Sequence, residues 1–230
     1  MQWIIDTASS PLVIQCLSMQ QNRNFNKIFK NIVQNLDISN GKPKLLLHVC
    51  CGPCSTIPLE RLKNYFDITL LFNNSNIYPK KEHDRRYEEL NRYIDETGYG
   101  YPIIYIDYDY DKYIADLKPY AEMPEGRERC RICFKKRLKQ LFEIASENHF
   151  DYACTVMSIS RYKNSKDLNT IGEELAKEYP SVKWLYADFK KENGYEDSLQ
   201  IIRDHEMYFQ EYCGCEFSYK KYQEKQENNH

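Results

Sequence analysis

Long apolar runs are missing from this sequence, which restricts the compartments and surfaces that the chain can occupy. No segment approaches the roughly 18 consecutive apolar residues that a membrane-spanning helix needs. Residues 1–20 also lack the basic start and the continuous apolar stretch of a secretory signal. We therefore expect a cytoplasmic protein that does not enter a membrane.

Net positive charge and internal repeats are absent as well. The chain has 32 Lys and Arg against 34 Asp and Glu, so it is not a polycation that would bind nucleic acid over its whole surface. No repeat or low-complexity linker divides the 230 residues, and a chain of this length can bury a sizeable core. The sequence predicts one main domain over residues 43–230, preceded by an N-terminal extension over residues 1–42 that contains one helix.

Two kinds of apolar pattern alternate from Lys44 onward. Short continuous apolar segments predict buried strands, and they lie at Leu45–Val49, Ile68–Phe72, Pro102–Ile106, Tyr152–Met157 and Val182–Tyr186. Helices are expected between them, near residues 56–65, 79–96, 107–120, 132–145 and 167–179, and after the last strand near residues 195–209. This alternation predicts a single-domain α/β fold, with a mainly parallel sheet covered by helices on both faces. Ligands of such folds bind beyond the carboxyl ends of the strands, and a cysteine cluster follows the first strand.

Cysteine is the most informative residue type here, because clustered thiols in a cytoplasmic protein are more often metal ligands or redox groups than structural disulfides. Seven of the nine cysteines form three groups: Cys50-Cys51-x-x-Cys54, Cys130-x-x-Cys133 and Cys213-x-Cys215. The odd total argues against a fully paired disulfide framework. Cys154 lies in a predicted strand and is expected to be an ordinary buried residue, and Cys16 lies in the extension.

Four kinds of chemistry fit some of these thiols. The two C-x-x-C pairs could hold a structural zinc ion, and the C-G-P-C sequence at 51–54 is typical of a thioredoxin-like dithiol. The zinc and the dithiol interpretations both leave other cysteines without a role. A disulfide framework conflicts with the missing secretory signal. An iron–sulfur centre held by the first two groups, with Cys213 and Cys215 as a separate redox pair, accounts for most of the thiols.

Five motifs carry a resemblance to a known family. They are HVCCGPCS at 48–55, FNNSNIYP at 72–79, ERCRICFKKRL at 128–138, MSISRYKN at 157–164 and YCGCEFS at 212–218. In this order and approximate spacing they resemble the motifs of the cobalamin-independent epoxyqueuosine reductases, over about Pro43–Tyr219. The resemblance implies an α/β enzyme that reduces epoxyqueuosine, a modified guanosine at the wobble position of certain tRNAs, to queuosine.

The resemblance also implies roles for the grouped cysteines. A [4Fe-4S] cluster would be held by four of them: Cys50, Cys51, Cys130 and Cys133. Cys213 and Cys215 match the family's redox-active disulfide. Cys54 stands where some relatives carry an aspartate near a second iron site, so Cys54 is a candidate catalytic residue and a second iron ion a candidate cofactor. Iron would stabilise the negative charge that develops on oxygen when the epoxide opens.

Polar and basic residues near the motifs are candidate contacts to the tRNA. Asn73 and Asn76 follow the second strand and could hydrogen-bond the hydroxyls of the modified base, although turn formation explains them equally well. Tyr78, Arg161 and Tyr162 could stack on an extruded base or bind phosphate. The most basic segment is expected to follow the anticodon backbone, through Arg127, Arg129, Arg131 and Lys135.

Two other functions are compatible with the same residues. One is a zinc-stabilised RNA-binding module, and the other is a small-molecule dithiol oxidoreductase that uses the C-G-P-C sequence. Bound iron and the broad visible absorption of an iron–sulfur protein would count against both. The sequence does not indicate which electron donor supplies the reductase.

Overall fold

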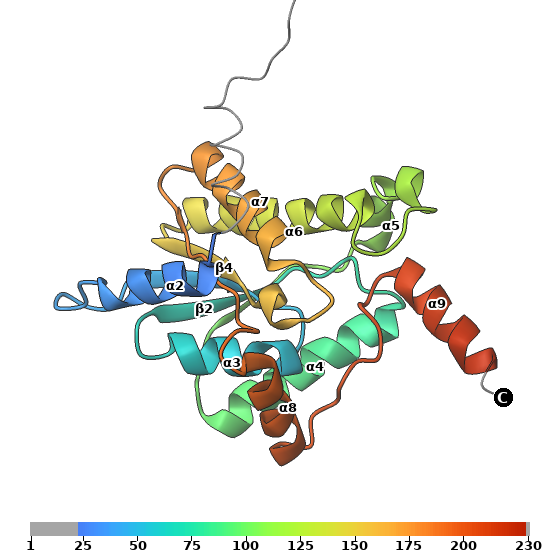
Figure 1. The fold of residues 1–230 in the computed structure, drawn as a ribbon, viewed down its shortest axis with the longest axis horizontal. Coiled ribbons are helices and arrows are strands. Elements are labelled where there is room, and N and C mark those ends of the chain that lie inside the picture. Colours follow the sequence, from blue (N-terminus) through green and yellow to red (C-terminus); the bar gives the residue numbers. More distant parts are fainter. Residues whose placement is uncertain (1–22, 229–230) are drawn as a thin grey trace, which may run out of the picture.

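A five-stranded sheet forms the centre of the computed structural model, which describes residues 23–228 (Figure 1). The strands are β1 (Lys44–His48), β2 (Asp67–Phe72), β3 (Ile103–Tyr105), β4 (Tyr152–Thr155) and β5 (Lys183–Trp184). They lie in the order β3-β2-β1-β4-β5, and every neighbouring pair is parallel. The parallel α/β fold predicted from the sequence is confirmed.

Helices cover both faces of the sheet. One face carries α3 (Gly52–Leu62), α4 (Lys80–Thr97) and α8 (Gly194–Asp204), and the other carries α6 (Glu128–Glu147) and α7 (Ser165–Glu178) (Figure 1). The central strand β1 shows why both faces need cover, because Leu45 and Leu47 pack into one apolar cluster and Leu46 into the other. A strand that is buried on both faces has the continuous apolar sequence found here.

The helix expected in the N-terminal extension is α2 (Phe25–Gln34), which begins after Asn24. The Asn24 side chain accepts a hydrogen bond from the backbone N–H of Lys27, as Asn commonly does at this position. Phe29 and Val33 of α2 pack into the same apolar cluster as α3 and α4. Residues 1–22 of the extension, which include Cys16, lie outside the described part of the chain.

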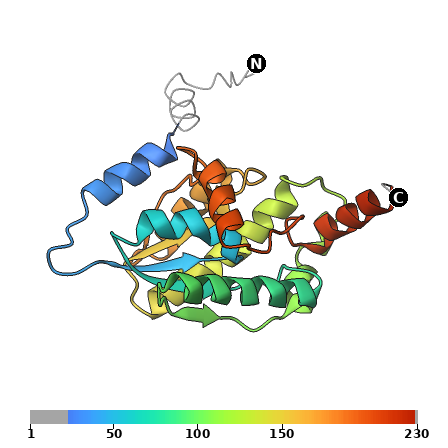
Figure 2. The same ribbon diagram turned by 90° about the horizontal axis from the view of Figure 1, so that it is seen from below.

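Two predicted helix boundaries near the site are wrong, and one helix was not predicted. Helix α3 begins at Gly52 rather than near residue 56, because the Cys51 thiol caps it and Pro53 fits its first turn. Helix α8 ends at Asp204, before residue 209. The segment after the last cysteine pair forms a further helix, α9 (Glu216–Glu227), which was not predicted and projects from one end of the molecule (Figures 1 and 2).

The remaining helical segments are short. They are α5 (Tyr110–Ala115) and two 3₁₀ turns, η1 (Lys118–Tyr120) and η2 (Val156–Ile159). No helix within residues 23–228 has both the length and the apolar character that crossing a membrane would require.

Candidate metal and redox site

A cavity of about 380 Å³ opens at the carboxyl edge of the sheet, beyond the ends of β1 and β4. Its lining includes Cys50 and Cys54 after β1, Lys163 after β4, and Cys213 ahead of α9. From β1 the chain continues to β2 and β3 on one side, and from β4 to β5 on the other. The loops after β1 and β4 therefore diverge, which is where open α/β sheets bind their ligands.

Cys50, Cys51 and Cys54 form a compact thiol group at this edge. Their Sγ atoms all lie within 4.8 Å of one another, and the three side chains are buried. The Cys51 Sγ accepts a hydrogen bond from the Cys54 backbone N–H at 3.4 Å, so the thiols lie at the N-terminus of α3, where the helix dipole favours a thiolate. Within residues 23–228, these three cysteines are the potential metal ligands that lie close enough together for three of them to bind one ion.

The three thiols differ in their affinity for protons. Hydrogen bonds from the thiols of Cys51 and Cys54 lower the pKa of Cys50 well below its usual value. Burial raises the pKa of Cys51, and the hydrogen bond to Cys50 raises the pKa of Cys54 to about 12. Of the three thiols, Cys50 therefore gives up its proton most readily.

Alkylation of the metal-free protein should reveal this order. After iron is removed with a chelator under reducing conditions, iodoacetamide at pH 7 is expected to modify Cys50 about tenfold faster than Cys54, because the thiolate is the reactive form. Modification of Cys54 should accelerate as the pH rises toward 12, whereas the Cys50 rate should level off at a lower pH. Peptide mass analysis of timed samples measures both rates, and faster labelling of Cys54 at pH 7 would contradict the assignment.

Cys130 and Cys133 lie in the first turns of α6 and do not join the compact group in this structure. The Cys130 Sγ accepts a hydrogen bond from the Gly126 backbone N–H at 3.2 Å, and the Tyr113 hydroxyl lies 3.2 Å from the Cys133 Sγ. Burial and the nearby charge of Cys213 raise the pKa of Cys130. Phe217, two residues after Cys215, packs against the apolar cluster that contains Cys133, so this pair lies near the Cys213-x-Cys215 segment. The ligand set of Cys50, Cys51, Cys130 and Cys133 stays a prediction.

The Cys213-x-Cys215 segment is held by backbone hydrogen bonds. Gly214 has φ +117°, a conformation that favours glycine, and its carbonyl accepts a hydrogen bond from the Tyr78 N–H at 2.7 Å. The Tyr212 hydroxyl in turn donates to the Tyr78 carbonyl at 2.7 Å. Both contacts anchor the cysteine pair to the turn that precedes α4.

Arg86 of α4 is a second anchor for this segment, a role that sequence reasoning did not assign to it. Its guanidinium donates to the carbonyl oxygens of Tyr212 and Cys213 at 3.1 and 3.2 Å. The side chain is only 2% exposed, and Nε pairs with a Glu82 carboxylate oxygen at 2.7 Å. Arg86 therefore supports the Cys213-x-Cys215 segment and is not a surface charge.

Buried positive charge surrounds the thiols. Arg137 of α6 is 3% exposed, and its Nε has no hydrogen-bond partner among the described residues. Burial lowers the pKa of Arg137, but the electrostatic influence of the neighbouring Cys133, Tyr113, Cys50 and Cys213 side chains outweighs this effect and raises it. Because iron–sulfur centres are held by anionic thiolates, this set of thiols and unpaired cations fits such a centre.

The predicted substrate-binding residues fall into two sets. Arg161 and Tyr162 line the cavity, and the Arg161 guanidinium lies 5.3 Å from the Tyr162 ring centroid. Asn73, Asn76 and Tyr78 are not among the described residues that line it. Asn73 instead donates to the carbonyl oxygen of Arg137 at 3.0 Å, which is a structural contact between β2 and α6.

The predicted RNA-binding residues are also divided. Arg129 is 4% exposed, donates to the carbonyl oxygens of Ala121 and Met123 at 2.5 Å, and stacks on Phe217. Arg131 pairs with Asp167 at 2.7 Å. Arg127 and Lys135 are exposed, so they are the members of this set that can reach a phosphate without breaking an internal contact.

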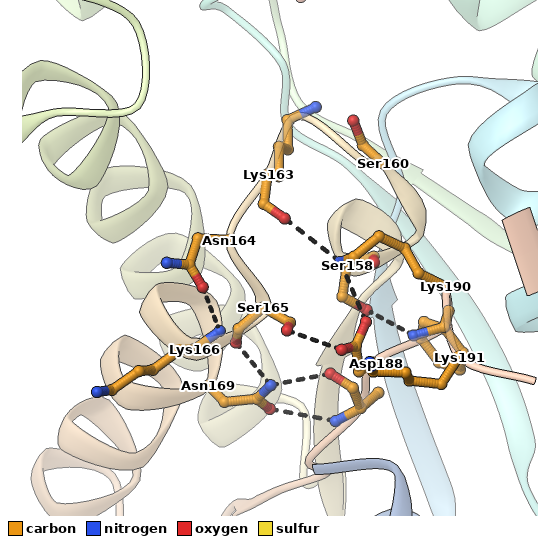
Figure 3. A network of polar contacts seen from close by, with 12 residues as sticks. Ser158, Ser160, Lys163, Asn164, Ser165, Lys166, Asn169, Asp188, Lys190 and Lys191 are labelled. Carbon is orange, nitrogen blue, oxygen red and sulfur yellow. Dashed lines mark hydrogen bonds and ion pairs between the residues drawn. The ribbon is translucent and has the colours of Figure 1, made fainter. Parts of the chain in front are cut away.

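The loop after β4 is fixed by a polar network (Figure 3). The Lys190 ammonium donates to the carbonyl oxygens of Ser158 and Lys163 at 2.7 and 3.3 Å and pairs with Asp188 at 3.0 Å. The Ser165 hydroxyl donates to the other Asp188 carboxylate oxygen at 2.9 Å. These contacts set the position of residues 160–163, which form one wall of the cavity.

Comparisons with known proteins point to one family. Residues 45–221 match a family model described as "Epoxyqueuosine reductase QueH", a span that contains all three cysteine groups. A protein of that name from Streptococcus pyogenes is 36% identical over 212 residues, which cover 90% of this chain and 83% of the relative. The relative from Staphylococcus epidermidis is 36% identical over 215 residues, which cover 90% of each chain. The relative from Thermotoga maritima is 27% identical over 184 residues, which cover 79% of this chain and 93% of the relative.

Proposed function

The chain belongs to the epoxyqueuosine reductase QueH family, an oxidoreductase family, and we propose that it reduces epoxyqueuosine to queuosine at the wobble position of tRNA. The observation that carries this proposal is the cavity at the carboxyl edge of the sheet. Thiols from two segments far apart in the sequence, Cys50 and Cys54 on one side and Cys213 on the other, line the same space. Reducing groups therefore surround a site that is open to a ligand.

The cysteine pair ahead of α9 supplies what the reaction consumes. Removing the epoxide oxygen as water takes up two electrons and two protons, and oxidation of the Cys213 and Cys215 thiols to a disulfide releases the same number of each. Burial raises the pKa of Cys215 to about 12, so this thiol keeps its proton at neutral pH and can deliver it with the electrons. An electron donor outside the chain must then reduce the disulfide again.

The remaining thiols suit a resident metal centre. A [4Fe-4S] cluster held by Cys50, Cys51, Cys130 and Cys133 would supply single-electron transfer between the dithiol and the substrate. Cys54 lines the cavity rather than lying behind it, and its pKa of about 12 would fall if a second iron ion took its proton's place. The protein's part is to keep Cys50, Cys51 and Cys54 buried and close together.

The tRNA would approach the cavity from its exposed rim. Tyr162 is 74% exposed, and Arg161 lies beside it, so an extruded base could stack there while Arg127 and Lys135 contact the backbone. Affinity should then fall steeply as salt is raised. We expect the enzyme to work in the cytoplasm, where its tRNA substrate is modified.

Mass analysis of nucleosides tests the function directly. Anaerobically purified protein, supplied with a chemical reductant, is expected to convert epoxyqueuosine in tRNA into a nucleoside that has lost one oxygen atom. An iron-loaded protein that leaves the nucleoside unchanged would contradict the proposal. Colourless protein with zinc and no iron would favour the RNA-binding module, and reduction of small disulfides alone would favour the dithiol oxidoreductase.

A further inference from the structure

We propose that the ammonium group of Lys163 binds the oxygen atom that the substrate loses and stabilises the negative charge that develops on it. This inference rests on the proposed function, because it concerns the same cavity and the same reaction. It assigns a catalytic residue on the wall formed by the loop after β4, opposite the thiols that follow β1.

The position of Lys163 is the first reason. It lines the cavity together with Cys50, Cys54 and Cys213, so it belongs to the part where electrons must reach the substrate. Its own carbonyl oxygen accepts a hydrogen bond from Lys190, which is itself paired with Asp188 (Figure 3). The backbone that carries the ammonium group is therefore held in place before a substrate arrives.

The charge environment of Lys163 is the second reason. Within residues 23–228 no carboxylate forms an ion pair with it, whereas nearby cations are paired: Lys190 with Asp188 and Arg131 with Asp167. Glu125 and Glu211 also line the cavity, but both are exposed, and Glu211 accepts a hydrogen bond from Tyr222. Lys163 thus offers whatever enters the cavity a positive charge that no carboxylate of residues 23–228 pairs with.

The proton of Lys163 is firmly held. Burial lowers its pKa, but the electrostatic influence of the neighbouring Cys213, Cys50 and Cys54 side chains outweighs that effect and raises it above the usual value. An ammonium group with a raised pKa is a poor acid, so Lys163 would act as a hydrogen-bond donor and a fixed positive charge. The two protons then come from the Cys213 and Cys215 thiols.

The atoms and electrons balance on that basis. Both carbon–oxygen bonds of the epoxide break, a carbon–carbon double bond forms, and the oxygen leaves as water with the two protons of the dithiol. The dithiol becomes a disulfide and gives up two electrons. Charge builds on the departing oxygen before it is fully protonated, and a preorganised cation in a partly buried site stabilises that charge without having to reorganise.

The alternative role for this lysine is a contact to an RNA phosphate, but other residues that line the cavity are better placed for that contact. Arg161, Lys221 and Lys225 are exposed on the rim, where the RNA backbone has room. Lys163 is half-buried beside the thiols. A phosphate bound there would keep the base away from the groups that reduce it.

Binding measurements without a reductant test the inference apart from turnover. The native protein is expected to bind epoxyqueuosine tRNA about tenfold more tightly than queuosine tRNA, because only the former carries the oxygen that the ammonium group contacts. Lys163→Met should reduce this ratio to about one. It should also lower kcat by about 10²–10³-fold, the usual cost of losing one such donor. Lys163→Arg should keep part of the affinity ratio and part of kcat.

Lys166→Met is the matched control, because Lys166 is exposed in the next turn of the chain and does not line the cavity. It should leave the affinity ratio and kcat unchanged. Iron content is measured in every variant, and a Lys163→Met protein with less iron than the native one would overturn the inference in favour of a role in holding the metal centre.

Two other results would also overturn the inference. If Lys163→Met weakens the binding of both tRNAs equally and reduces the salt dependence of binding by about one phosphate contact, Lys163 binds the RNA backbone. An unchanged affinity ratio with unchanged kcat would show that it does not touch the reacting oxygen. If the native protein itself fails to convert epoxyqueuosine, the proposed function fails instead, so the two failures are distinguishable.

Discussion

Replacing Arg86 with methionine is expected to lower the free energy of unfolding by about 3–5 kcal/mol, since it leaves a buried carboxylate without its partner. Glu82 is 8% exposed, and its Oε1 lies 2.7 Å from the Arg86 Nε. The other Glu82 oxygen accepts only the Tyr208 hydroxyl, at 2.9 Å. Nothing else in the described chain pairs with this carboxylate, so its charge stays buried and uncompensated.

The same substitution should impair the redox pair. Arg86 donates to the carbonyl oxygens of Tyr212 and Cys213, and methionine can donate to neither. A Cβ on Gly214 would lie 2.9 Å from an Arg86 nitrogen, which shows how closely this loop packs on the guanidinium. We expect the midpoint potential of the Cys213–Cys215 couple to shift and multiple turnover to slow by about tenfold or more, as when a supporting contact is lost.

Denaturant unfolding and a thiol–disulfide redox titration measure the two effects. Lys81→Met is the matched control, because Lys81 lies in the same helix but is exposed, and it should change neither quantity appreciably. Adding Glu82→Gln to Arg86→Met should restore part of the stability by removing the unpaired charge, but not the potential. A potential that stays at the native value in the folded single variant would contradict the positioning role.

The strands were predictable because burial on both faces leaves a continuous apolar sequence. Leu45, Leu46 and Leu47 are all fully buried, and no other regular structure of that length explains such a run between turn residues. The start of α3 was not predictable from apolar periodicity, because the residue that caps the helix is a cysteine. Helix α9 was missed because its sequence is mostly polar, and its anchoring depends on tyrosines such as Tyr212 and Tyr219, whose rings lie 5.2 Å apart.

The cysteine groups of the site could be read from spacing alone, but the cations around them could not. Arg127 and Arg129 look equivalent in the sequence, yet one is exposed and the other is buried against backbone carbonyls. The buried face of α6 includes a residue at every fourth position, namely Arg129, Cys133 and Arg137. Helical periodicity therefore indicates that these two arginines are buried, whereas a count of basic residues does not. The assignment of Lys163 and Arg86 needed the tertiary structure, because their partners are remote in the sequence.

Serine at Cys213 or Cys215 is expected to abolish multiple turnover, with a fall of about 10³-fold or more. In the proposed reaction the two thiols act as one unit, since neither alone can form the disulfide that releases an electron pair. Residues that act as a unit are not additive, so each single variant should be as inactive as the double variant. A graded result, with the double variant clearly worse than either single one, would contradict a shared redox step.

Measurements of iron content and stability distinguish loss of the dithiol from disruption of the metal site. Both cysteines are half-buried at the edge of the cavity and precede α9, outside the compact group of Cys50, Cys51 and Cys54. The serine variants should therefore keep the native iron content, whereas Cys50→Ser should lose it. Cys154→Ala is the control for losing a thiol elsewhere, because Cys154 is buried in β4, and its turnover should stay within about twofold of the native rate. Loss of iron in the Cys213 variant would place that thiol among the metal ligands, and the electron pair would then have to reach the substrate without a dithiol in this chain.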